Sequence, residues 1–154
     1  MNLLQRSAAL VASAAVLAAG TTVLAAGPAG AATTEITLQN VATSRYLDSN
    51  GNGNVYTLPG NGGAYQRWYA GDLGGSTFTL RNKATGLCLD SNGNGNGAVY
   101  TLSCNGGSYQ KWVRGNGAYG HTYKNLATSL YLDSNGNGDV YALRGNGGSY
   151  QQWR

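Results

Sequence analysis

The most constraining feature of this sequence is a motif that occurs three times along the chain. The sequence Leu-Asp-Ser-Asn-Gly-Asn-Gly is found at residues 47–53, 89–95 and 132–138. Its period of about 42 residues is typical of chains in which one supersecondary unit is repeated. Such a unit is too small to bury a core by itself, so the copies must pack against one another. Fold and function are therefore to be inferred from the repeated unit.

Each copy contains short apolar and aromatic runs separated by loops rich in asparagine and glycine. In the first copy, apolar–polar alternation and aromatic or β-branched residues predict four strands, at residues 35–39, 46–48, 55–58 and 66–68. The loop of residues 49–54 contains Asn and Gly, which accept positive φ and are typical of hairpins.

The repeat accounts for the whole chain after residue 31. The copies extend over about residues 35–70, 77–114 and 120–154, so twelve strands are expected. The hairpin loop of the second copy is longer, and loops absorb such insertions at small cost. The connecting segments 69–77 and 113–120 are expected to be glycine-rich turns and not linkers between domains.

Three copies of a four-stranded unit narrow the choice of all-β architecture. A β-propeller typically needs four or more blades. We therefore predict a β-trefoil, in which three units close around a pseudo-threefold axis and bury a shared core. Leu38, Leu47, Trp68 and their counterparts are expected to form that core. The tryptophans are expected to anchor it, at Trp68, Trp112 and Trp153.

The first 31 residues have the organisation of a secretory signal peptide. Arg6 gives a positive start, residues 8–26 form an alanine-rich apolar stretch, and Ala29-Gly30-Ala31 is a small-residue cleavage site. A permanent membrane anchor is the less favoured alternative, because alanine contributes little to membrane insertion. Residues 32–154 are then expected to be one extracellular, secreted domain.

Charge and cysteine content agree with export. The chain has 10 Lys and Arg against 6 Asp and Glu, and the cations are spread without a basic run. Nucleic-acid binding needs clustered cations that displace counterions from phosphates, so the sequence does not favour it. Cys88 and Cys104 fit an exported protein with one disulfide. No membrane association is expected after signal cleavage, and the protein is expected to be a monomer.

The sequence offers little support for catalysis or metal binding. A glycosidase needs two carboxylates that flank one bond, whereas the recurring acids come one per repeat. His121 aligns with Ile36 and Phe78, so a structural role is expected for it. Asp-x-Asn-x-Asn-Gly matches the start of a calcium loop, but the acid required at the twelfth position is replaced by Pro59, Thr101 or Arg144. We predict no enzyme, no metal and no cofactor.

Gln-x-Trp occurs once in every copy, about 20 residues after a Leu-Asp pair. This threefold spacing resembles the ricin-type β-trefoil lectins, and in particular the carbohydrate-binding modules of secreted actinobacterial proteins. In that family a cysteine before Leu-Asp bridges a second cysteine that precedes the Trp. Cys88 and Cys104 occupy these places in the second copy. The other copies have a tyrosine and a glycine there, Tyr46 with Gly60 and Tyr131 with Gly145.

The resemblance implies one shallow, solvent-exposed sugar site in each repeat. The family builds it from the Asp of Leu-Asp, a polar residue just after the second cysteine place, and the amide of Gln-x-Trp. A carboxylate accepts hydrogen bonds from neighbouring hydroxyls, and the amides donate and accept around the sugar ring. The residues implicated are Asp48, Asn61, Gln66, Asp90, Asn105, Gln110, Asp133, Asn146 and Gln151.

The sequence departs from the family pattern in the same way in all copies. The aromatic residue on which the family packs the sugar is replaced by Leu58, Leu102 and Leu143. Tyrosines two positions earlier on the same strand face are candidates to stack a sugar instead, at Tyr56, Tyr100 and Tyr141. The loop tyrosines that precede the glutamines are further candidates, at Tyr65, Tyr109 and Tyr150.

Structural explanations of the same residues stay open at this point. The aspartates are alternatively caps of the Asn-Gly loops, through hydrogen bonds from side chain to backbone. The Gln-x-Trp residues are alternatively architecture, and the tyrosines alternatively fill the pleated strand surface.

The sequence predicts a secreted lectin that binds a polysaccharide or glycan by avidity through up to three like sites. The competing hypothesis is an interaction protein, such as a trefoil protease inhibitor that uses one exposed loop. A lectin should depend on the three equivalent aspartate sites, whereas an inhibitor should depend on a single loop such as residues 92–98.

Overall fold

The structure is a computed structural model that describes residues 32–92, 94 and 97–154. The predicted signal peptide, residues 1–31, lies outside the described residues. Eleven strands are described, β1 (Thr33–Ile36), β2 (Tyr46–Ser49), β3 (Val55–Leu58), β4 (Trp68–Asp72), β5 (Thr77–Asn82), β6 (Cys88–Ser91), β7 (Val99–Leu102), β8 (Trp112–Asn116), β9 (His121–Asn125), β10 (Tyr131–Ser134) and β11 (Val140–Leu143). In this part of the chain no helix is long and apolar enough to cross a membrane.

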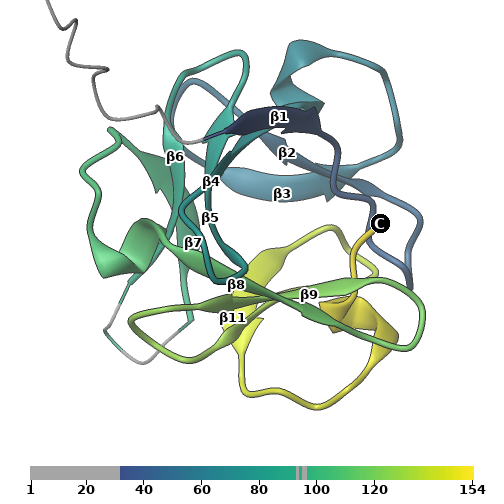
Figure 1. The fold of residues 1–154 in the computed structure, drawn as a ribbon. Coiled ribbons are helices and arrows are strands. Elements are labelled where there is room, and N and C mark those ends of the chain that lie inside the picture. The colour runs from purple at the N-terminus through teal and green to yellow at the C-terminus, as the bar shows by residue number, and fades with distance from the viewer. Residues whose placement is uncertain (1–31, 93, 95–96) are drawn as a thin grey trace, which may run out of the picture.

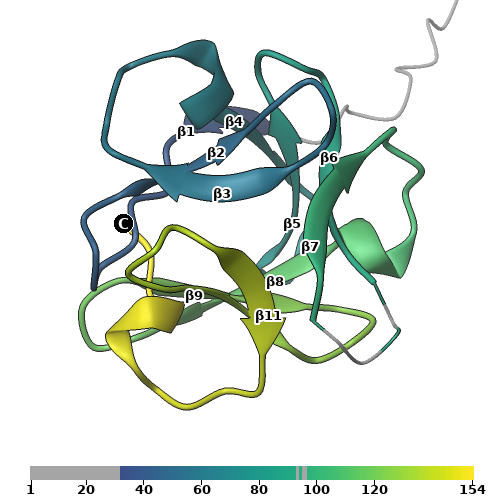
Figure 2. The same ribbon diagram turned by 180° about the vertical axis from the view of Figure 1, so that it is seen from behind.

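The strands form a barrel and three hairpins about a pseudo-threefold axis. The strands β1, β4, β5, β8 and β9 pair in this order and make the barrel wall. Each copy adds one antiparallel hairpin, β2–β3, β6–β7 or β10–β11. Figure 1 shows one lobe for each copy, and Figure 2 shows β3, β7 and β11 gathered at one end of the barrel. The predicted all-β trefoil is confirmed.

Trp153 closes the barrel at the place where the repeat predicts a twelfth strand. It forms isolated bridges with both His121 and Asn40. Backbone hydrogen bonds join Arg154 and Gln39 in both directions at 2.9 Å. The fourth strand of the third copy is thus reduced to a bridge, so the prediction of twelve strands is wrong by one for the described residues.

The fourth strand of the first copy begins later than the sequence pattern predicts. Gln66 belongs to the 3₁₀ turn Ala64–Gln66, and β4 begins at Trp68. The turn recurs at residues 108–110 and 149–151. The chain must turn before it enters the barrel, because the preceding loop lies outside the barrel and the tryptophan lies inside it. The glutamine is therefore a turn residue and not a strand residue.

The connectors between copies are partly strand and not only glycine-rich turns, which corrects the prediction for segments 69–77 and 113–120. Gly71 lies within β4, and a Cβ on it would stand 2.7 Å from Oγ1 of Thr79 on β5. Gly115 on β8 meets Thr122 at the same distance. Glycine here permits close approach of two strands, a role that composition alone does not distinguish from a turn.

The predicted core residues are all buried in one cluster. Leu38, Leu47, Trp68, Leu80, Leu89, Trp112, Tyr123, Leu132 and Trp153 are each at most 4% exposed. The indole N–H of each tryptophan donates to the carbonyl oxygen of the leucine in its own Leu-Asp pair, at 3.0 to 3.1 Å. A buried indole needs such a partner. This bond therefore fixes each hairpin on the barrel.

The Asn-Gly loops join neighbouring copies in a ring. The ring bonds are Thr101 N to Gly53 O at 2.8 Å, Ala142 N to Gly97 O at 2.7 Å and Thr57 N to Gly138 O at 2.8 Å. Gly53 has a φ of +84°, and a Cβ on it would stand 2.7 Å from the carbonyl oxygen of Thr101. Only glycine satisfies both the positive φ and the close approach. These loops therefore connect neighbouring copies through backbone hydrogen bonds.

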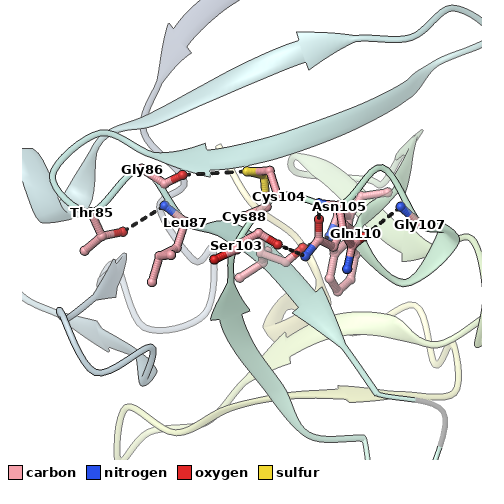
Figure 3. Close-up of a disulfide and its surroundings, with 11 residues drawn as sticks. Thr85, Gly86, Leu87, Cys88, Ser103, Cys104, Asn105, Gly107 and Gln110 are labelled. Carbon is pink, nitrogen blue, oxygen red and sulfur yellow. Dashed lines mark hydrogen bonds between the residues drawn. A yellow bond between two sulfur atoms is a disulfide. The ribbon is translucent and has the colours of Figure 1, made fainter.

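Cys88 and Cys104 form the predicted disulfide, with their Cα atoms 5.1 Å apart (Figure 3). The bond ties the start of β6 to the loop that follows β7. In the same close-up, Gln110 lies beside this loop, and its Nε2 donates a hydrogen bond to the carbonyl oxygen of Ser103 at 3.1 Å.

Candidate functional site

The aspartate of every Leu-Asp pair lies directly opposite a tyrosine on the neighbouring strand. In the first copy, Asp48 of β2 pairs with Tyr56 of β3. The other pairs are Asp90 with Tyr100 and Asp133 with Tyr141. Directly opposed residues of an antiparallel pair project from the same sheet face, so each repeat places a carboxylate beside a phenol. The structure thus brings together two of the residue sets predicted from the sequence.

The aspartate side chains are buried and not open to solvent. Asp48, Asp90 and Asp133 are 3%, 4% and 3% exposed. Burial raises the pKa of Asp48, while hydrogen bonds from Gln66 and from the backbone N–H of Ser49 act in the opposite direction. The pKa of Asp133 is raised for the same reasons. The expectation of an open carboxylate at a shallow surface is corrected, because the neighbouring side chains cover it.

The aspartate is not the residue that caps the Asn-Gly loop. Asn50 has that role, since its Oδ1 accepts hydrogen bonds from the backbone N–H groups of Asn52 at 3.0 Å and Asn54 at 3.1 Å. Asn135 repeats the arrangement in the third copy. The loop-cap explanation therefore applies to the asparagine that lies two residues after the aspartate.

The glutamine of Gln-x-Trp holds the loop that follows the hairpin. Gln66 is buried, its Oε1 accepts from Asn61 N at 3.0 Å, and its Nε2 donates to Pro59 O at 3.1 Å. Gln110 and Gln151 make the same two bonds in their own loops. Because Gln66 also donates to Asp48, one side chain positions both the loop and the carboxylate. Its primary role is architectural.

Asn61 lies on the exposed surface of this loop. Its Oδ1 accepts a hydrogen bond from Gly63 N at 2.8 Å, so the oxygen stabilises the loop. No hydrogen bond within the described part of the chain uses its Nδ2, which leaves an amide donor at the surface. Asn105 and Asn146 hold their loops in the same way. These predicted residues therefore combine a structural oxygen with an available donor.

The loop tyrosines are exposed in all three copies. Tyr65, Tyr109 and Tyr150 are 48%, 46% and 46% exposed. The backbone carbonyl oxygen of Tyr65 accepts a hydrogen bond from Nδ2 of Asn82, at 2.8 Å, and Asn82 belongs to the next copy. The tyrosine loop of each repeat is therefore held by a side chain of its neighbour.

Sequence reasoning missed these asparagines. Asn82 is fully buried, and Asn125 and Asn40 hold the carbonyl oxygens of Tyr109 and Tyr150 in the same way. The Oδ1 atom of each also accepts from the two backbone N–H groups that begin the following turn. The available signal was an Asn-x-Ala-Thr sequence repeated at residues 40–43, 82–85 and 125–128. Its contacts cross between copies, so periodicity alone could not assign them.

Each strand tyrosine shares an electrostatic environment with the aspartate and the loop tyrosine. Burial is the main cause that raises the pKa of Tyr56, and the charges of Asp48 and Tyr65 raise it further. Tyr100 also donates a hydrogen bond to the Asp90 carboxylate, which raises its pKa in the same direction. Aspartate, strand tyrosine and loop tyrosine therefore form one cluster in each repeat, in which the aspartate is buried and the loop tyrosine is exposed.

Leucine extends this cluster on the outer side. Leu58, Leu102 and Leu143 are 40%, 47% and 45% exposed. Leu58 follows Tyr56 by two positions on β3, so both side chains project from the same sheet face. The place where the family has an aromatic platform is therefore an exposed aliphatic surface that is flanked by tyrosine.

A surface hollow lies beside the glycine-rich loop of each repeat. The hollows have volumes of about 540, 290 and 380 Å³ in copies one, two and three. Each is lined by the glutamine of Gln-x-Trp and by loop residues, and none includes the aspartate or the strand tyrosine in its lining. The hollow of each repeat is thus lined separately from the aspartate and the strand tyrosine.

Comparison with known proteins gives a family match over almost all of the described chain. The model of the family described as "Ricin-type beta-trefoil lectin domain" matches residues 34–153. The matched range contains all three repeats, and with them every Leu-Asp pair and every Gln-x-Trp sequence.

Two solved structures show the same fold. The designed threefold symmetric protein ThreeFoil superposes with a TM-score of 0.72 at 27% identity, covering 78% of this chain and 96% of the designed chain. The exo-β-1,3-galactanase 1,3Gal43A from Clostridium thermocellum gives a TM-score of 0.71 at 22% identity. That match covers 79% of this chain but only 29% of the galactanase, so it concerns one part of the larger protein.

Proposed function

Since the chain belongs to the ricin-type β-trefoil lectin family, we propose that the protein is a secreted lectin that binds a polysaccharide or glycan through three like sites. The ricin-type domain is a carbohydrate-binding, non-catalytic domain, and the proposal accordingly includes no reaction. The observation that carries it is the threefold recurrence of one cluster, in which a buried aspartate underlies a strand tyrosine and an exposed loop tyrosine.

In the proposed complex, the tyrosines and the loop asparagine contact the sugar directly. The exposed rings of Tyr65 and its counterparts offer apolar faces to the C–H groups of a pyranose. The amide donor of Asn61 and the phenol oxygens supply hydrogen bonds to hydroxyls. Because Leu58 continues this surface, its isobutyl group takes the apolar contact that an aromatic platform makes in the family.

The buried aspartate acts through the tyrosine above it. A carboxylate that accepts the hydrogen bond of Tyr100, as Asp90 does, fixes the phenol proton toward the protein. The lone pairs of the phenol oxygen then face outward and accept from a sugar hydroxyl. This role differs from direct contact between carboxylate and sugar, and it follows from the low exposure of Asp90.

Binding through three sites explains how sugar sites that are individually weak can hold a polysaccharide firmly. Hydrogen bonds at an exposed site largely replace hydrogen bonds to water, so each contributes only about 0.5–1.5 kcal/mol. Three sites on one rigid body raise the apparent affinity for a repeating polymer by roughly 10²–10⁴. Secretion is part of the proposal and is supported by the signal-peptide sequence and by the Cys88–Cys104 disulfide.

The test begins with a glycan array to find a ligand and continues with retention on the matching polysaccharide. Replacing one loop tyrosine, as in Tyr109→Ala, should reduce retention mildly. The triple variant Tyr65→Ala, Tyr109→Ala, Tyr150→Ala should abolish it while circular dichroism shows an intact fold. Tyr119→Ala is the matched control, since Tyr119 is 67% exposed and belongs to none of the clusters.

The aspartates are tested separately with the triple change to Ala at positions 48, 90 and 133. It should weaken retention strongly, because no side-chain acceptor is left to fix the phenol proton. Full retention by both triple variants would contradict the proposal. Loss of all binding after a change in one loop alone would favour an interaction protein that uses a single loop.

A further inference from the structure

The open end of the barrel contains a cavity that the three sugar sites do not explain. It has a volume of about 400 Å³, within the range of about 300–1,000 Å³ that is usual for small-molecule sites. Its lining comes from the barrel strands β1, β4, β5, β8 and β9 and from the ends of the described domain, and no hairpin strand contributes. The cavity is therefore formed by the barrel strands and not by the hairpins, and the barrel strands β1, β4, β8 and β9 can be followed in Figure 1.

The cavity arises where the pseudo-threefold symmetry fails. Two residues after the first tryptophan the chain has Ala70, whereas the equivalent residue of the second copy is Arg114. His121 stands where the other copies have Ile36 and Phe78. Ala70 is smaller than its counterpart Arg114, and His121 differs from its counterparts Ile36 and Phe78. These differences leave space that three identical copies would fill. The molecule has three similar sugar clusters, but this arrangement occurs once among the described residues.

The inner part of the cavity is apolar and largely aromatic. Leu38 and Tyr123 are 1% and 4% exposed, and Ile36 and Phe78 pack against the same core. Three aromatic side chains, those of Phe78, His121 and Tyr123, take part in the lining. Such a wall favours a flat apolar group, since aromatic pairs contribute beyond the area that they bury.

The charged side chains that line the cavity are those of Arg114, Arg154 and Asp72. Arg114 lies over the ring of Phe78, with its guanidinium carbon 4.7 Å from the ring centroid. Within the described part of the chain its side chain makes no hydrogen bond or ion pair. Arg154 also lines the rim, whereas Asp72, the carboxylate in the lining, already accepts a hydrogen bond from Gly74 N at 2.8 Å. A guanidinium fork with unused donors is suited to a carboxylate or a sulfonate.

We infer that the barrel end binds one small aromatic acid, whose ring enters between Phe78 and Tyr123 and whose anionic group pairs with Arg114. The proximity of Arg114 to the aromatic wall is supported by Tyr123, whose pKa is raised by burial and lowered again by the Arg114 charge. The site is independent of the proposed sugar clusters, because it shares no residue with them.

The test uses 8-anilinonaphthalene-1-sulfonate as the probe, followed by fluorescence titration and calorimetry on the folded protein. We expect one probe per molecule. Arg114→Gln should weaken its affinity at least tenfold, and the uncharged analogue N-phenyl-1-naphthylamine should bind the parent at least tenfold more weakly. The matched control is Arg81→Gln. Arg81 also lies over an aromatic ring, 5.2 Å from the centroid of Tyr69, but it does not line the cavity.

A second variant fills the cavity and leaves the charges in place. Ala70→Leu should abolish probe binding with an unchanged near-ultraviolet circular dichroism spectrum, because Ala70 lines the cavity and the larger side chain can extend into its volume. The inference is overturned if the native parent does not bind the probe, if three probes bind per molecule, or if Arg114→Gln and Arg81→Gln have equal affinities. Retention on polysaccharide should be the same in Arg114→Gln as in the parent, so the two proposals fail separately.

Discussion

The ring of Tyr46 lies against Gly60, so close that a Cβ on this glycine would stand 2.8 Å from Cε2 of the tyrosine. Tyr131 and Gly145 have the same relationship in the third copy, also at 2.8 Å. The second copy has the Cys88–Cys104 disulfide in this place. The hairpin and the loop that follows it are thus joined by a disulfide in the second repeat. In the first and third repeats the same place is filled by a tyrosine ring that packs on a glycine.

This substitution predicts that the disulfide is dispensable for folding. In the chain-entropy model a crosslink that closes a loop of 16 residues contributes about 3 kcal/mol. The double variant Cys88→Ala, Cys104→Ala should therefore fold at room temperature with a lower melting temperature, measured by circular dichroism. A double variant that does not fold at all would show that the second copy depends on its crosslink.

Gly60→Ala should destabilise the protein by about 1 kcal/mol, because the tyrosine ring must move to admit the methyl group. Gly51→Ala is the control, since nothing lies within 4 Å of the added Cβ. Urea denaturation measures both. The destabilisation by Gly60→Ala should vanish in a Tyr46→Ala background. If Gly60→Ala lowers the free energy of unfolding equally with and without the tyrosine ring, this contact is not the cause.

Ala142→Thr should stabilise the protein by about 1 kcal/mol. Ser49 and Ser134 are buried and hydrogen-bonded to the threonines of neighbouring copies, Thr101 and Thr57, at 3.2 Å. Ser91 has no such partner within the described residues, because the equivalent position is Ala142. Ala142→Val adds the same bulk without the hydroxyl. The threonine variant should have a higher urea midpoint than the valine variant, because only threonine can form a hydrogen bond with Ser91. Equal midpoints would show that this hydrogen bond does not stabilise the protein.

Asn82→Ala should release the loop of Tyr65 in the first copy and cost about 1–3 kcal/mol, because it leaves buried backbone groups without partners. Hydrogen exchange should accelerate in the turn of residues 64–66 and remain unchanged in the turn of residues 149–151. The exposed Asn52→Ala is the control for loss of an asparagine, because Asn52 lies in another loop of the same copy and its side chain makes no hydrogen bond within the described residues. Unchanged exchange at residues 64–66 in Asn82→Ala would show that the hydrogen bond from Asn82 is not needed to order this loop.

Asp48 and Asp133 should make stability depend on pH in a defined direction. Burial raises the folded pKa of both carboxyls above the ordinary value of 3.8, so between these values the folded state binds more protons than the unfolded state. Their contribution to stability therefore falls as the pH rises through this window. The double variant Asp48→Asn, Asp133→Asn should lose this dependence when urea midpoints are compared from about pH 4 to 7. Identical pH profiles of parent and variant would contradict it.

The architecture and the composition of the site clusters could be predicted from the sequence because they are properties of the repeat. Three Leu-Asp and Gln-x-Trp pairs at a fixed period specify a threefold unit, and alternation in Val55–Leu58 places Tyr56 and Leu58 on one face. The disulfide and the core tryptophans follow from the same register. Local periodicity carries this information because strand neighbours within one hairpin are close in sequence.

Contacts between copies were decided only by the tertiary structure. The bond from Asn82 to the loop of Tyr65, the ring of bonds through Gly53 and the closure of the barrel at Trp153 all join different repeats. The burial of Asp48 is also tertiary, since its partner Gln66 comes from the turn before β4 and not from the hairpin. A repeat specifies each unit equally, whereas the cavity beside Arg114 is lined by residues of all three copies, and only the assembled barrel brings these residues together.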